Sequence, residues 1–521
     1  MSRIHLTFFF GWISLFFCAK YNLLAAQEKL VYDQKMNSEK VFFSLDEAKK
    51  QPLEVTKLNL SQQALTKVPF EILKFSNLKE LDLSNNQLNN LPGGLIFLKK
   101  LEILRLSNNK LNQVPDQLDT LEYLHSLDLR NNLFVEIPKP ICGIKNLENL
   151  EFSFNKIQKI PDEISQLTQL KYLDLSYNQL AVISPLIGQL KSLQSLILHN
   201  NTLENLTPEI AELSKLKILQ LDHNQLSRLP KELSKLKNLE ELYVNHNQLT
   251  SLSEIMTGLK RLIILEAYYN RIAGIPEDIQ DMHQLESLIL HHNQINKLPG
   301  SISALTQLKK LELADNQIED ITPGLEKLKN LLLLDLNKNK ISSLNPEFFQ
   351  MNSLKVLHLS NNQLSRIPEQ ISGLTQLNIL DLSFNRLQNL PLAMGQLPDL
   401  TTLLISFNLL TTLPPEVVTL KALTLMDARG NQISTIGEDL QSLVKLQRLF
   451  LQNNQISSIP QSLTQLKSLE ELYLDDNQIT ALPVWLKDFP HLHKLSLVGN
   501  RIPQTAIEKM RTELPHLSIF F

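Results

Sequence analysis

Aromatic and histidine side chains recur at one position, spaced 23 residues apart, in the first half of the chain. This position holds Phe154, Tyr177, Asn200, His223, His246, Tyr269 and His292, and residues close by add Tyr172, His199, Tyr243, Tyr268 and His291. Tyrosine and histidine offer a large, fairly rigid contact area with a polar tip, which suits an interface hot spot. Apart from Asn200, these residues are called the aromatic–histidine stripe, and we predict that they bind a partner.

Two other interpretations start from the same residues. The recurring position could be half-buried and accept any flat side chain, as Phe384 and Phe407 further along the chain suggest. The histidines could instead converge on a metal ion, which requires three or four ligands. The histidines in question are His199, His223, His246 and His292. Stacked imidazoles in solvent are the commoner arrangement, so we expect no metal and no cofactor.

Acidic residues accompany the stripe at Asp174, Asp222 and Glu266. Aromatic rings over an acidic floor suit a sugar as well as a basic protein loop, so the expected partner is a protein or a glycan. A second, patchier group contains Leu404, Phe407, Phe450 and Tyr473, for which we expect a solvated ridge.

A repeat of 23 residues must position these side chains. Leucines keep this spacing from Leu78 and Leu101 through to Leu492, and Val55 extends the series upstream. Each repeat follows L-x-x-L-x-L-x-x-N-x-L-x-x-L-P-x-x-I-x-x-L-x-x, which gives twenty repeats over residues 55–514. Around the second and third leucines the residues alternate inward and outward, which is strand periodicity.

An asparagine stands where each strand ends and the chain must turn. Nineteen of the twenty repeats carry it, and the first has Gln63 instead. A buried amide can satisfy backbone groups of its own and the neighbouring coil, so a stacked row fixes the register. This predicted asparagine ladder contains Asn86, Asn109, Asn132, Asn155, Asn178, Asn201, Asn224, Asn247, Asn270 and Asn293, and continues to Asn500.

The return segment has isoleucine and leucine at helical spacing. Proline opens it in thirteen repeats, which suits the first turn of a helix. Ser184, Thr207, Ser253, Thr322 and Asn345 replace proline elsewhere and could cap a short helix.

This pattern resembles the leucine-rich-repeat family over almost the whole chain. It is similar to bacterial secreted members, in which an S-L-x-E-A-type helix opens the solenoid, as in Ser44-Leu45-Asp46-Glu47-Ala48. It also resembles Ras-group-related and plant disease-resistance repeats. The resemblance implies an α/β fold: a curved, right-handed solenoid with a parallel β-sheet on its concave face and short helical or 3-10 turns on its convex face. Strands pack closer than helices, which places the sheet inside the curve.

The two ends are expected to differ from the repeats. Residues 1–26 read as a secretory signal peptide, with an apolar run over residues 6–17. Residues 27–54 form an N-terminal segment with a capping helix, which a capping box of Ser44 and Glu47 would start. Residues 503–521, which overlap the last repeat, form a C-terminal cap made of an amphipathic helix and a final short strand.

Only two cysteines occur. Cys18 lies in the signal region and could be lipidated, which is the one route to a membrane that we consider. Cys142 lies in the apolar row of the fifth repeat and is expected to be a packed thiol.

Charge and motifs narrow the class of function. The net charge is −3, from 51 basic and 54 acidic residues, so nothing steers the chain to nucleic acid. The phosphate-loop, nucleophile-elbow, zinc-protease and calcium-loop motifs are absent from the sequence, so we expect no enzyme. The favoured function is an extracytoplasmic scaffold that binds its partner on the concave face. An intracellular, signalling-type scaffold and a self-associating surface adhesin remain open.

Overall fold

The computed structural model describes residues 40–321, 323–413, 415–514 and 517–521. The expected signal peptide at 1–26, the lipidation candidate Cys18 and the expected helix cap Thr322 lie outside the described residues. The described chain divides into two compact units, each a stack of coils. The smaller unit comprises the described residues up to Phe134 together with Pro138–Asn155, and the larger comprises Val135–Ile137 and Lys156–Phe521.

The smaller unit begins with a short strand and a one-turn helix and continues as a parallel sheet. Its described strands are β1 (Val41–Phe42), β2 (Lys57–Asn59), β3 (Glu80–Asp82), β4 (Ile103–Arg105), β5 (Ser126–Asp128) and β6 (Asn149–Glu151). Its helical segments are α2 (Leu45–Ala48), η1 (Phe70–Lys74), η2 (Gly93–Phe97), η3 (Leu118–Thr120) and α3 (Lys139–Cys142). Cys142 is fully buried in α3, as a packed side chain.

The larger unit repeats the same coil many more times. Its described strands are β7 (Tyr172–Asp174), β8 (Ser195–Ile197), β9 (Ile218–Gln220), β10 (Glu241–Tyr243), β11 (Ile264–Glu266), β12 (Ser287–Ile289), β13 (Lys310–Glu312), β14 (Leu333–Asp335), β15 (Val356–His358), β16 (Ile379–Asp381), β17 (Thr402–Leu404), β18 (Leu425–Asp427), β19 (Arg448–Phe450), β20 (Glu471–Tyr473), β21 (Lys494–Ser496) and β22 (Ser518–Phe520).

Helical segments close the coils of the larger unit. They are η4 (Asp162–Gln166), η5 (Pro185–Gln189), η6 (Pro208–Glu212), η7 (Lys231–Lys235), α4 (Ser253–Met256), η8 (Glu277–Asp281), η9 (Gly300–Ala304), η10 (Leu325–Lys327), η11 (Pro346–Gln350), η12 (Glu369–Gly373), η13 (Leu392–Gln396), η14 (Pro415–Thr419), η15 (Glu438–Ser442), η16 (Gln461–Gln465), η17 (Val484–Asp488) and α5 (Gln504–Glu513).

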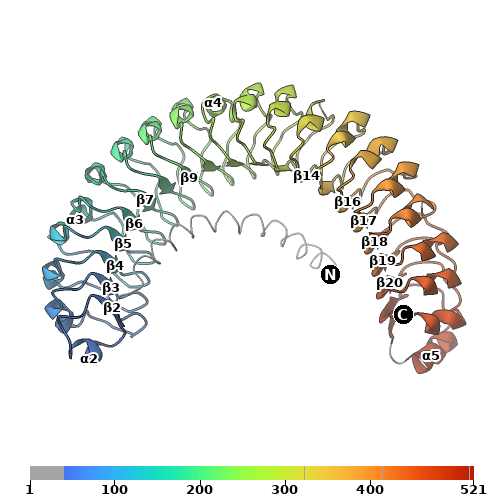
Figure 1. Cartoon of the computed structure of the whole chain (residues 1–521), viewed down its shortest axis with the longest axis horizontal. Coiled ribbons are helices and arrows are strands. Elements are labelled where there is room, and N and C mark those ends of the chain that lie inside the picture. Colours follow the sequence, from blue (N-terminus) through green and yellow to red (C-terminus); the bar gives the residue numbers. More distant parts are fainter. Residues whose placement is uncertain (1–39, 322, 414, 515–516) are drawn as a thin grey trace. The chain divides into compact units, whose positions relative to one another are not determined.

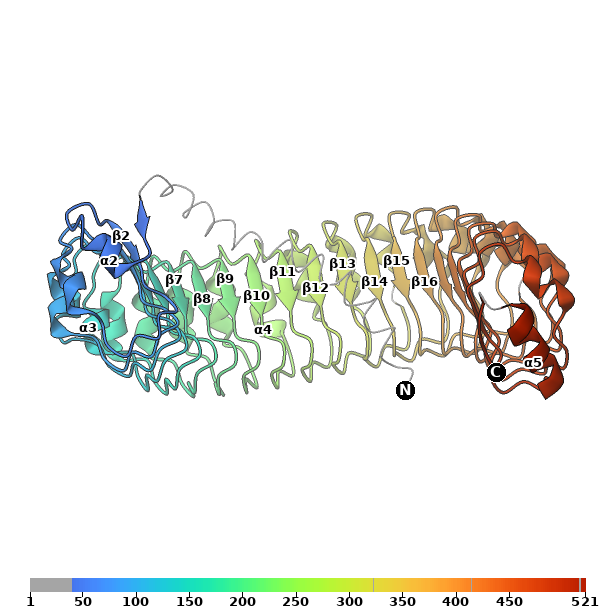
Figure 2. The same cartoon turned by 90° about the horizontal axis from the view of Figure 1, so that it is seen from below.

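From β2 to β6 in the smaller unit and from β7 to β21 in the larger, consecutive strands pair in parallel with a constant offset of one repeat. Glu241 of β10 lies opposite Ile264 of β11, which in turn lies opposite Ser287 of β12. Figure 2 shows strands β7 to β16 of the larger unit side by side. Because the offset equals the sequence repeat, residues at equivalent positions form straight rows across the sheet.

Alternation within each strand separates the core from the exposed face of the sheet. In β10 and the turn after it, Leu242 and Val244 are fully buried, whereas Glu241 and Tyr243 are half-buried and face the other way. Figure 1 shows the strands of the larger unit along the inside of a curve and the helical segments along the outside. The expected α/β solenoid, with a concave parallel sheet and short convex 3-10 turns, is confirmed.

The asparagine side chains tie each coil to its predecessor. Asn247 Nδ2 donates to the carbonyls of Leu221 in the coil before, at 3.0 Å, and of Val244 in its own coil, at 3.1 Å. Its Oδ1 accepts from the backbone N–H of Leu226 in the coil before, at 2.9 Å. Asn86 makes the same bonds in the smaller unit, to the carbonyls of Leu60 and Leu83. Each amide thus satisfies buried turn groups that water does not reach.

The residue before each ladder asparagine has a left-handed backbone. The φ angle at this position lies between 50° and 58° in residues as different as Asn85, Tyr177, His246 and Lys338. Glycine, asparagine, aspartate and histidine tolerate this conformation, whereas phenylalanine and tyrosine are rarely found there. We call this row of residues the left-handed row.

Details of the caps and turns differ from expectation. Proline precedes the 3-10 segments, as Pro92 does for η2, with an extended ψ of 140°, so it is the N-cap and not the first helical residue. Ser184 and Asn345 do cap η5 and η11, since their side chains accept from Leu186 and Phe348. Thr207 makes no such bond, and Ser253 is the first residue of α4 and not its cap.

The N-terminal capping box was a wrong prediction. Ser44 is the N-cap of α2 but its side chain makes no capping bond, and Glu47 instead pairs with Lys40 at 3.1 Å. The pull of this ammonium draws the carboxylate away from the helix terminus. Strand β1, which pairs with β2, was not predicted at all, because two residues carry no visible alternation.

Candidate binding surface

The stripe of the larger unit lies along the concave face and its turn edge. Tyr177, His223, His246, Tyr269 and His292 belong to the left-handed row. Tyr172 begins β7 and Tyr243 ends β10, so both stand on the sheet itself. Tyr268 and His291 occupy the turn between the strand and the left-handed row, and His199 occupies the same place three coils before Tyr268.

Six side chains of the stripe form one continuous block of stacked rings, here called the stacked block. In the left-handed row, His223 stacks on His246 at 4.0 Å between ring centroids, His246 on Tyr269 at 4.5 Å, and Tyr269 on His292 at 4.0 Å. Beside them Tyr268 stacks on His291 at 4.4 Å. Edge contacts join the two rows, for example His246 with Tyr268 at 5.4 Å.

Two polar contacts end the stacked block at its C-terminal side. His292 Nε2 lies 3.2 Å from Asp315 Oδ2. His292 Nδ1 and His291 Nδ1 are hydrogen-bonded at 2.8 Å, and the tautomers of the two rings decide which nitrogen donates. These contacts orient the two imidazoles.

Burial lowers the pKa of three imidazoles of the stacked block. Desolvation lowers the pKa of His246 and His292, and it lowers the pKa of His291 to about 4 against the opposing pull of Glu312. At neutral pH these three imidazoles therefore present flat, uncharged rings with polar edges. Such a surface is suited to stacking and hydrogen bonding more than to charge pairing.

The remaining residues of the stripe lie outside the stacked block. Tyr177 meets His199 edge-on at 5.1 Å, and Asn200 Nδ2 lies 2.8 Å from His199 Nδ1. The Tyr243 hydroxyl donates to Glu241 at 2.8 Å. Phe154 belongs to the smaller unit, where it has a left-handed φ of 55° and is about half exposed.

The aromatic side chains of the left-handed row are about half-buried, so both interpretations, a recognition surface and a slot for any flat side chain, remain open. Tyr269 is 44% exposed and Phe384 is 47% exposed. What the row shares is backbone conformation, which the residue types alone did not reveal.

Acidic residues stand on the sheet next to the stacked block. Burial raises the pKa of Glu266 to about 7, opposed by Lys310, and the charges of Glu312, Asp222 and Glu241 raise it further. Burial likewise raises the pKa values of Asp222 and Glu241. Sequence reasoning found Asp222 and Glu266 but missed Glu241 and Glu312, which share the outward positions of β10 and β13.

One of the expected acidic neighbours is already satisfied within its own turn. The carboxylate of Asp174 accepts from the backbone N–H and the hydroxyl of Ser176, at 2.9 and 2.6 Å. Asp174 is therefore a turn-stabilising residue and not part of the acidic floor.

Replacing Glu266 by glutamine should stabilise the protein in alkaline solution only. The folded-state pKa of about 7 exceeds the unfolded value of roughly 4.3, so this carboxyl favours the folded chain below pH ~4.3, and that contribution is lost as the pH rises through 7. We expect Glu266→Gln to raise the free energy of unfolding at pH 8 by about 1–3 kcal/mol after solvent screening, and to leave it unchanged at pH 4. Urea unfolding of both proteins at the two pH values measures this. An equal change at both would contradict the assignment.

The second aromatic group separates into two unconnected pairs among the described contacts. Phe407 stacks on Phe384 at 4.3 Å in the left-handed row, and Phe450 of β19 stacks on Tyr473 of β20 at 4.8 Å. Leu404 is only 6% exposed and belongs to the core edge. Phe384 and Phe407 form the exposed pair of this region.

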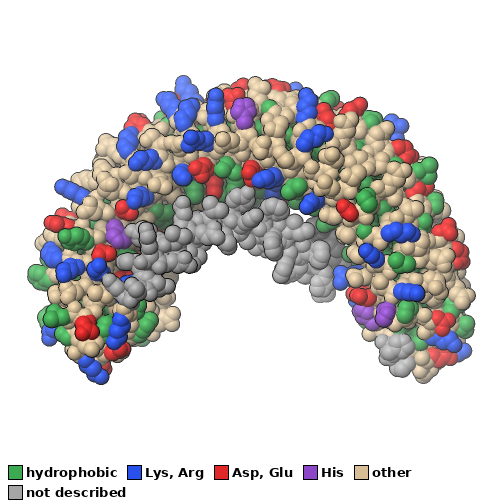
Figure 3. Space-filling model, in the orientation of Figure 1, with side chains coloured by type: hydrophobic (Ala, Val, Ile, Leu, Met, Phe, Trp, Pro, Cys, Tyr) green, Lys and Arg blue, Asp and Glu red, His purple; other side chains and the backbone are tan. Residues whose placement is uncertain are grey.

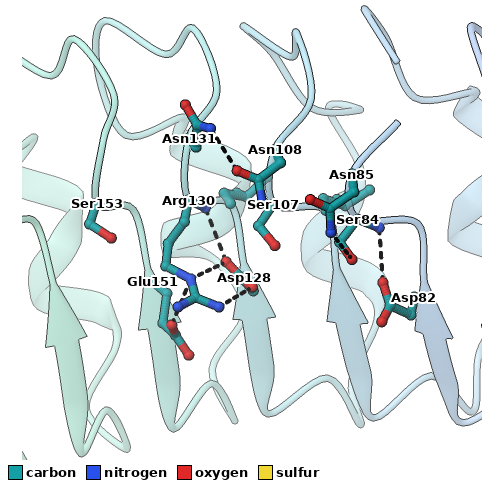
Figure 4. A network of polar contacts seen from close by, with 12 residues as sticks. Asp82, Ser84, Asn85, Ser107, Asn108, Asp128, Arg130, Asn131, Glu151 and Ser153 are labelled. Atoms are coloured by element: carbon teal, nitrogen blue, oxygen red, sulfur yellow. Dashed lines mark hydrogen bonds and ion pairs between the residues drawn. The ribbon is translucent and has the colours of Figure 1, made fainter. Parts of the chain in front are cut away.

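In the smaller unit the concave charges are paired with one another. Figure 4 shows Arg130 between Asp128 and Glu151, with Nη2 of Arg130 2.8 Å from Asp128 and Nε 2.9 Å from Glu151. Asn131 Nδ2 donates to Asn108 Oδ1 in the preceding coil at 2.6 Å. These contacts satisfy the charges of Asp128, Arg130 and Glu151 within the smaller unit.

Figure 3 shows basic and acidic side chains interspersed over the visible face, with no broad area of one sign. Within the described ranges, no group of three or more histidine, cysteine, aspartate or glutamate residues is placed to hold a metal ion. None of the described helices has the length and apolar character needed to cross a membrane.

Comparison with known proteins agrees with the class that the fold defines, an α/β solenoid of leucine-rich repeats. The leucine rich repeat family profile matches more than half of the chain, at residues 54–111, 122–180, 306–350, 329–387, 398–456 and 445–502. A leucine-rich repeat region profile matches residues 160–274. The chain therefore belongs to the leucine-rich repeat family. A comparison with curated protein sequences found no match.

Solved structures extend this comparison. A leucine-rich repeat protein of Leptospira interrogans is 30% identical with a TM-score of 0.62, and the match covers 92% of this chain and 100% of that one. The Arabidopsis receptor kinase HAESA, solved with the peptide hormone IDA and a co-receptor, is 29% identical with a TM-score of 0.61, covering 85% of this chain and 82% of that one. An internalin from Listeria monocytogenes, at 24% identity, a TM-score of 0.51 and coverage of 63% and 87%, shares the fold.

Proposed function

We propose that this protein is a non-catalytic scaffold that binds a protein partner on the concave side of its larger unit, through the residues of the aromatic–histidine stripe that belong to this unit. The observation that carries the proposal is the stacked block, whose rings lie in the turns along the edge of the concave face, outside the core. Its members contribute contact area to a partner without being needed to fill the interior.

Backbone conformation supports a functional origin for the rings. Tyrosine in the left-handed region costs of order 1–3 kcal/mol, and asparagine or glycine could occupy the same positions more cheaply. Tyr177 and Tyr269 both have this conformation. Backbone strain that does not contribute to the stability of the fold is typical of binding sites.

The relatives support the same class of function. HAESA, whose structure holds a peptide hormone and a co-receptor, shares the solenoid over most of both chains. We further propose that this chain acts outside the cytoplasm, as a receptor ectodomain does. An intracellular scaffold or a self-associating adhesin would differ in the partner captured.

Alanine at Tyr243, His246, Tyr268 and His292 together is expected to abolish capture of the partner. Removing the stacked rings should weaken binding by at least about a hundredfold while the melting temperature moves by only about 3 °C, because the core is untouched. The partner is first isolated by cross-linking and co-purification from intact cells, and its affinity for each variant is then measured by surface plasmon resonance.

The matched control is Phe384→Ala with Phe407→Ala, which removes an equally exposed stacked pair from the same row of the same unit. This control should keep full affinity. Unfolding of the four-alanine variant would show that the stripe is structural, and unchanged binding, or binding to glycans with no protein partner, would contradict the proposed function.

A further inference from the structure

In two coils of the described chain an arginine binds the carboxylate that ends the strand two residues before it. In the smaller unit, Arg130 Nε and Nη2 lie 2.9 and 2.8 Å from the two oxygens of Asp128, which ends strand β5, and the guanidinium reaches Glu151 of the next coil (Figure 4). The arginine stands two residues after the carboxylate. This places a planar, charge-assisted contact over the end of the strand.

The same arrangement recurs in the larger unit with an aromatic neighbour. Arg429 Nη2 lies 2.6 Å from Asp427, which ends strand β18, and the guanidinium lies 5.2 Å from the ring centroid of Phe450 in the next coil. In this fold, therefore, a carboxylate at the end of a strand can bind a guanidinium that also lies beside an aromatic ring.

The coil of strand β11 has the carboxylate and the rings but not the arginine. Glu266 ends β11, and Tyr268 stands two residues later, where arginine stands in the other two coils. Tyr243 lies directly opposite Glu266 in the neighbouring strand. Among the described residues, no cation lies within ion-pairing distance of Glu266, and Lys310 pairs with Glu312 at 2.9 Å.

The side chain of Asn245, close to this coil, has an oxygen that lacks a hydrogen-bond donor among the described residues. Asn245 is only 3% exposed, and its Oδ1 atom has no hydrogen-bond partner within the part of the chain that the structure describes. By the alternation of β10, Asn245 faces the concave side, in the row between Asp222 and Tyr268. A buried carbonyl without a donor costs about 1–3 kcal/mol, which a bound donor recovers.

We propose that the carboxylate of Glu266 and the side-chain oxygen Oδ1 of Asn245 bind the guanidinium of an arginine side chain carried by the protein partner. The rings of Tyr243 and Tyr268 lie beside this guanidinium. The inference rests on the proposed function, since the partner presents the arginine. Within the described residues, Glu266 has no ion-pair partner and Asn245 Oδ1 has no donor, and the acidic residues Asp222 and Glu241 lie nearby. A planar guanidinium has several fixed donors and stacks on rings, whereas an ammonium does neither equally well.

Protonation of Glu266 gives the site a pH dependence that supports this assignment. With a pKa of about 7 the free carboxyl is partly protonated near neutrality, and a bound cation favours its ionised form. Binding of the guanidinium therefore releases a proton and tightens as the pH rises from 6 to 8. The titratable and charged groups near Glu266 are Glu241 of β10, Lys310 and Glu312 of β13, and Asp222 from the turn after β9, together with His246 and His291, whose pKa values burial lowers.

The test uses small probes on the full chain. N-acetyl-arginine N-methylamide, its citrulline counterpart of equal shape and no charge, and its lysine counterpart are titrated at millimolar concentration, with binding followed by saturation-transfer NMR. The wild type should bind the arginine probe at least about tenfold more tightly than either counterpart. Glu266→Gln should remove this preference. The control Glu240→Gln, whose carboxylate is on the preceding coil and pairs with Lys217 at 3.4 Å, should retain it.

Equal binding of the citrulline probe, equal binding of the lysine probe, or an unchanged arginine preference in Glu266→Gln would each overturn the proposal. Assay of the captured partner separates this failure from failure of the proposed function. If Glu266→Gln binds that partner as the wild type does while the four-alanine variant does not, the stripe is the site and the arginine contact is wrong. If neither variant weakens binding, the proposed function itself fails.

Discussion

Alanine at Asn247 is expected to lower the free energy of unfolding of the larger unit by about 4 kcal/mol. The change removes the bonds to the carbonyls of Leu221 and Val244 and to the N–H of Leu226, all between 2.9 and 3.1 Å. Asn247 is buried, so each released backbone group loses its partner without gaining water, at about 1–3 kcal/mol each. Urea unfolding followed by circular dichroism measures the loss.

Asn238 provides the matched control for Asn247. It also bonds to the preceding coil, from Nδ2 to the Ser214 carbonyl at 2.8 Å, but this contact is exposed. Water replaces the lost partner there, so Asn238→Ala should cost less than about 1 kcal/mol. Similar losses at the two positions would mean that burial of the asparagine ladder does not govern its contribution.

Alanine at Gly258 is expected to destabilise the larger unit by about 3 kcal/mol. A Cβ atom there would lie 1.8 Å from the carbonyl oxygen of Ser234 and 2.5 Å from its carbon, and both are backbone atoms of the preceding coil. A backbone cannot yield as a flexible side chain does, so the two coils must move apart. Denaturant unfolding and hydrogen exchange across η7 and α4 would locate the disturbance.

Gly274 is the matched control, which separates the steric effect at Gly258 from the general effect of replacing a glycine. A Cβ atom at Gly274 would meet no atom within 4 Å, so alanine there should be neutral or stabilising by about 0.5 kcal/mol. If Gly258→Ala were tolerated as well as Gly274→Ala, close approach of coils on the convex side would not limit this stack.

The repeat determined which residues would share a row, because the strand offset equals the sequence period. For this reason the sequence spacing alone, as in Tyr269, His292 and Asn247, predicted that the stripe and the asparagine ladder form rows. The contacts between side chains within a row could not be predicted from the spacing. Stacking of His246 on Tyr269 depends on the left-handed backbone, which aims both rings along the same edge.

Chemistry of the acidic floor was only partly predictable. Asp174 and Glu266 occupy the same place in the repeat, yet Asp174 is satisfied by Ser176 in its own turn, whereas Tyr268 stands at that position in the coil of Glu266. The environment of each carboxylate depends on neighbours one and two coils away. At the N-terminal helix, Glu47 pairs with Lys40, which the capping-box pattern does not include.

Binding of a partner to the aromatic–histidine stripe is tested most directly by hydroxyl-radical footprinting of the protein alone and in complex with the captured partner. Tyr268 and Tyr269 should be modified at least about fivefold more slowly in the complex, because the partner covers them. Tyr123, exposed beside the convex segment η3, should be unchanged. Undiminished modification of Tyr268 and Tyr269, with protection at Phe384 and Phe407 or on the convex side, would contradict the account.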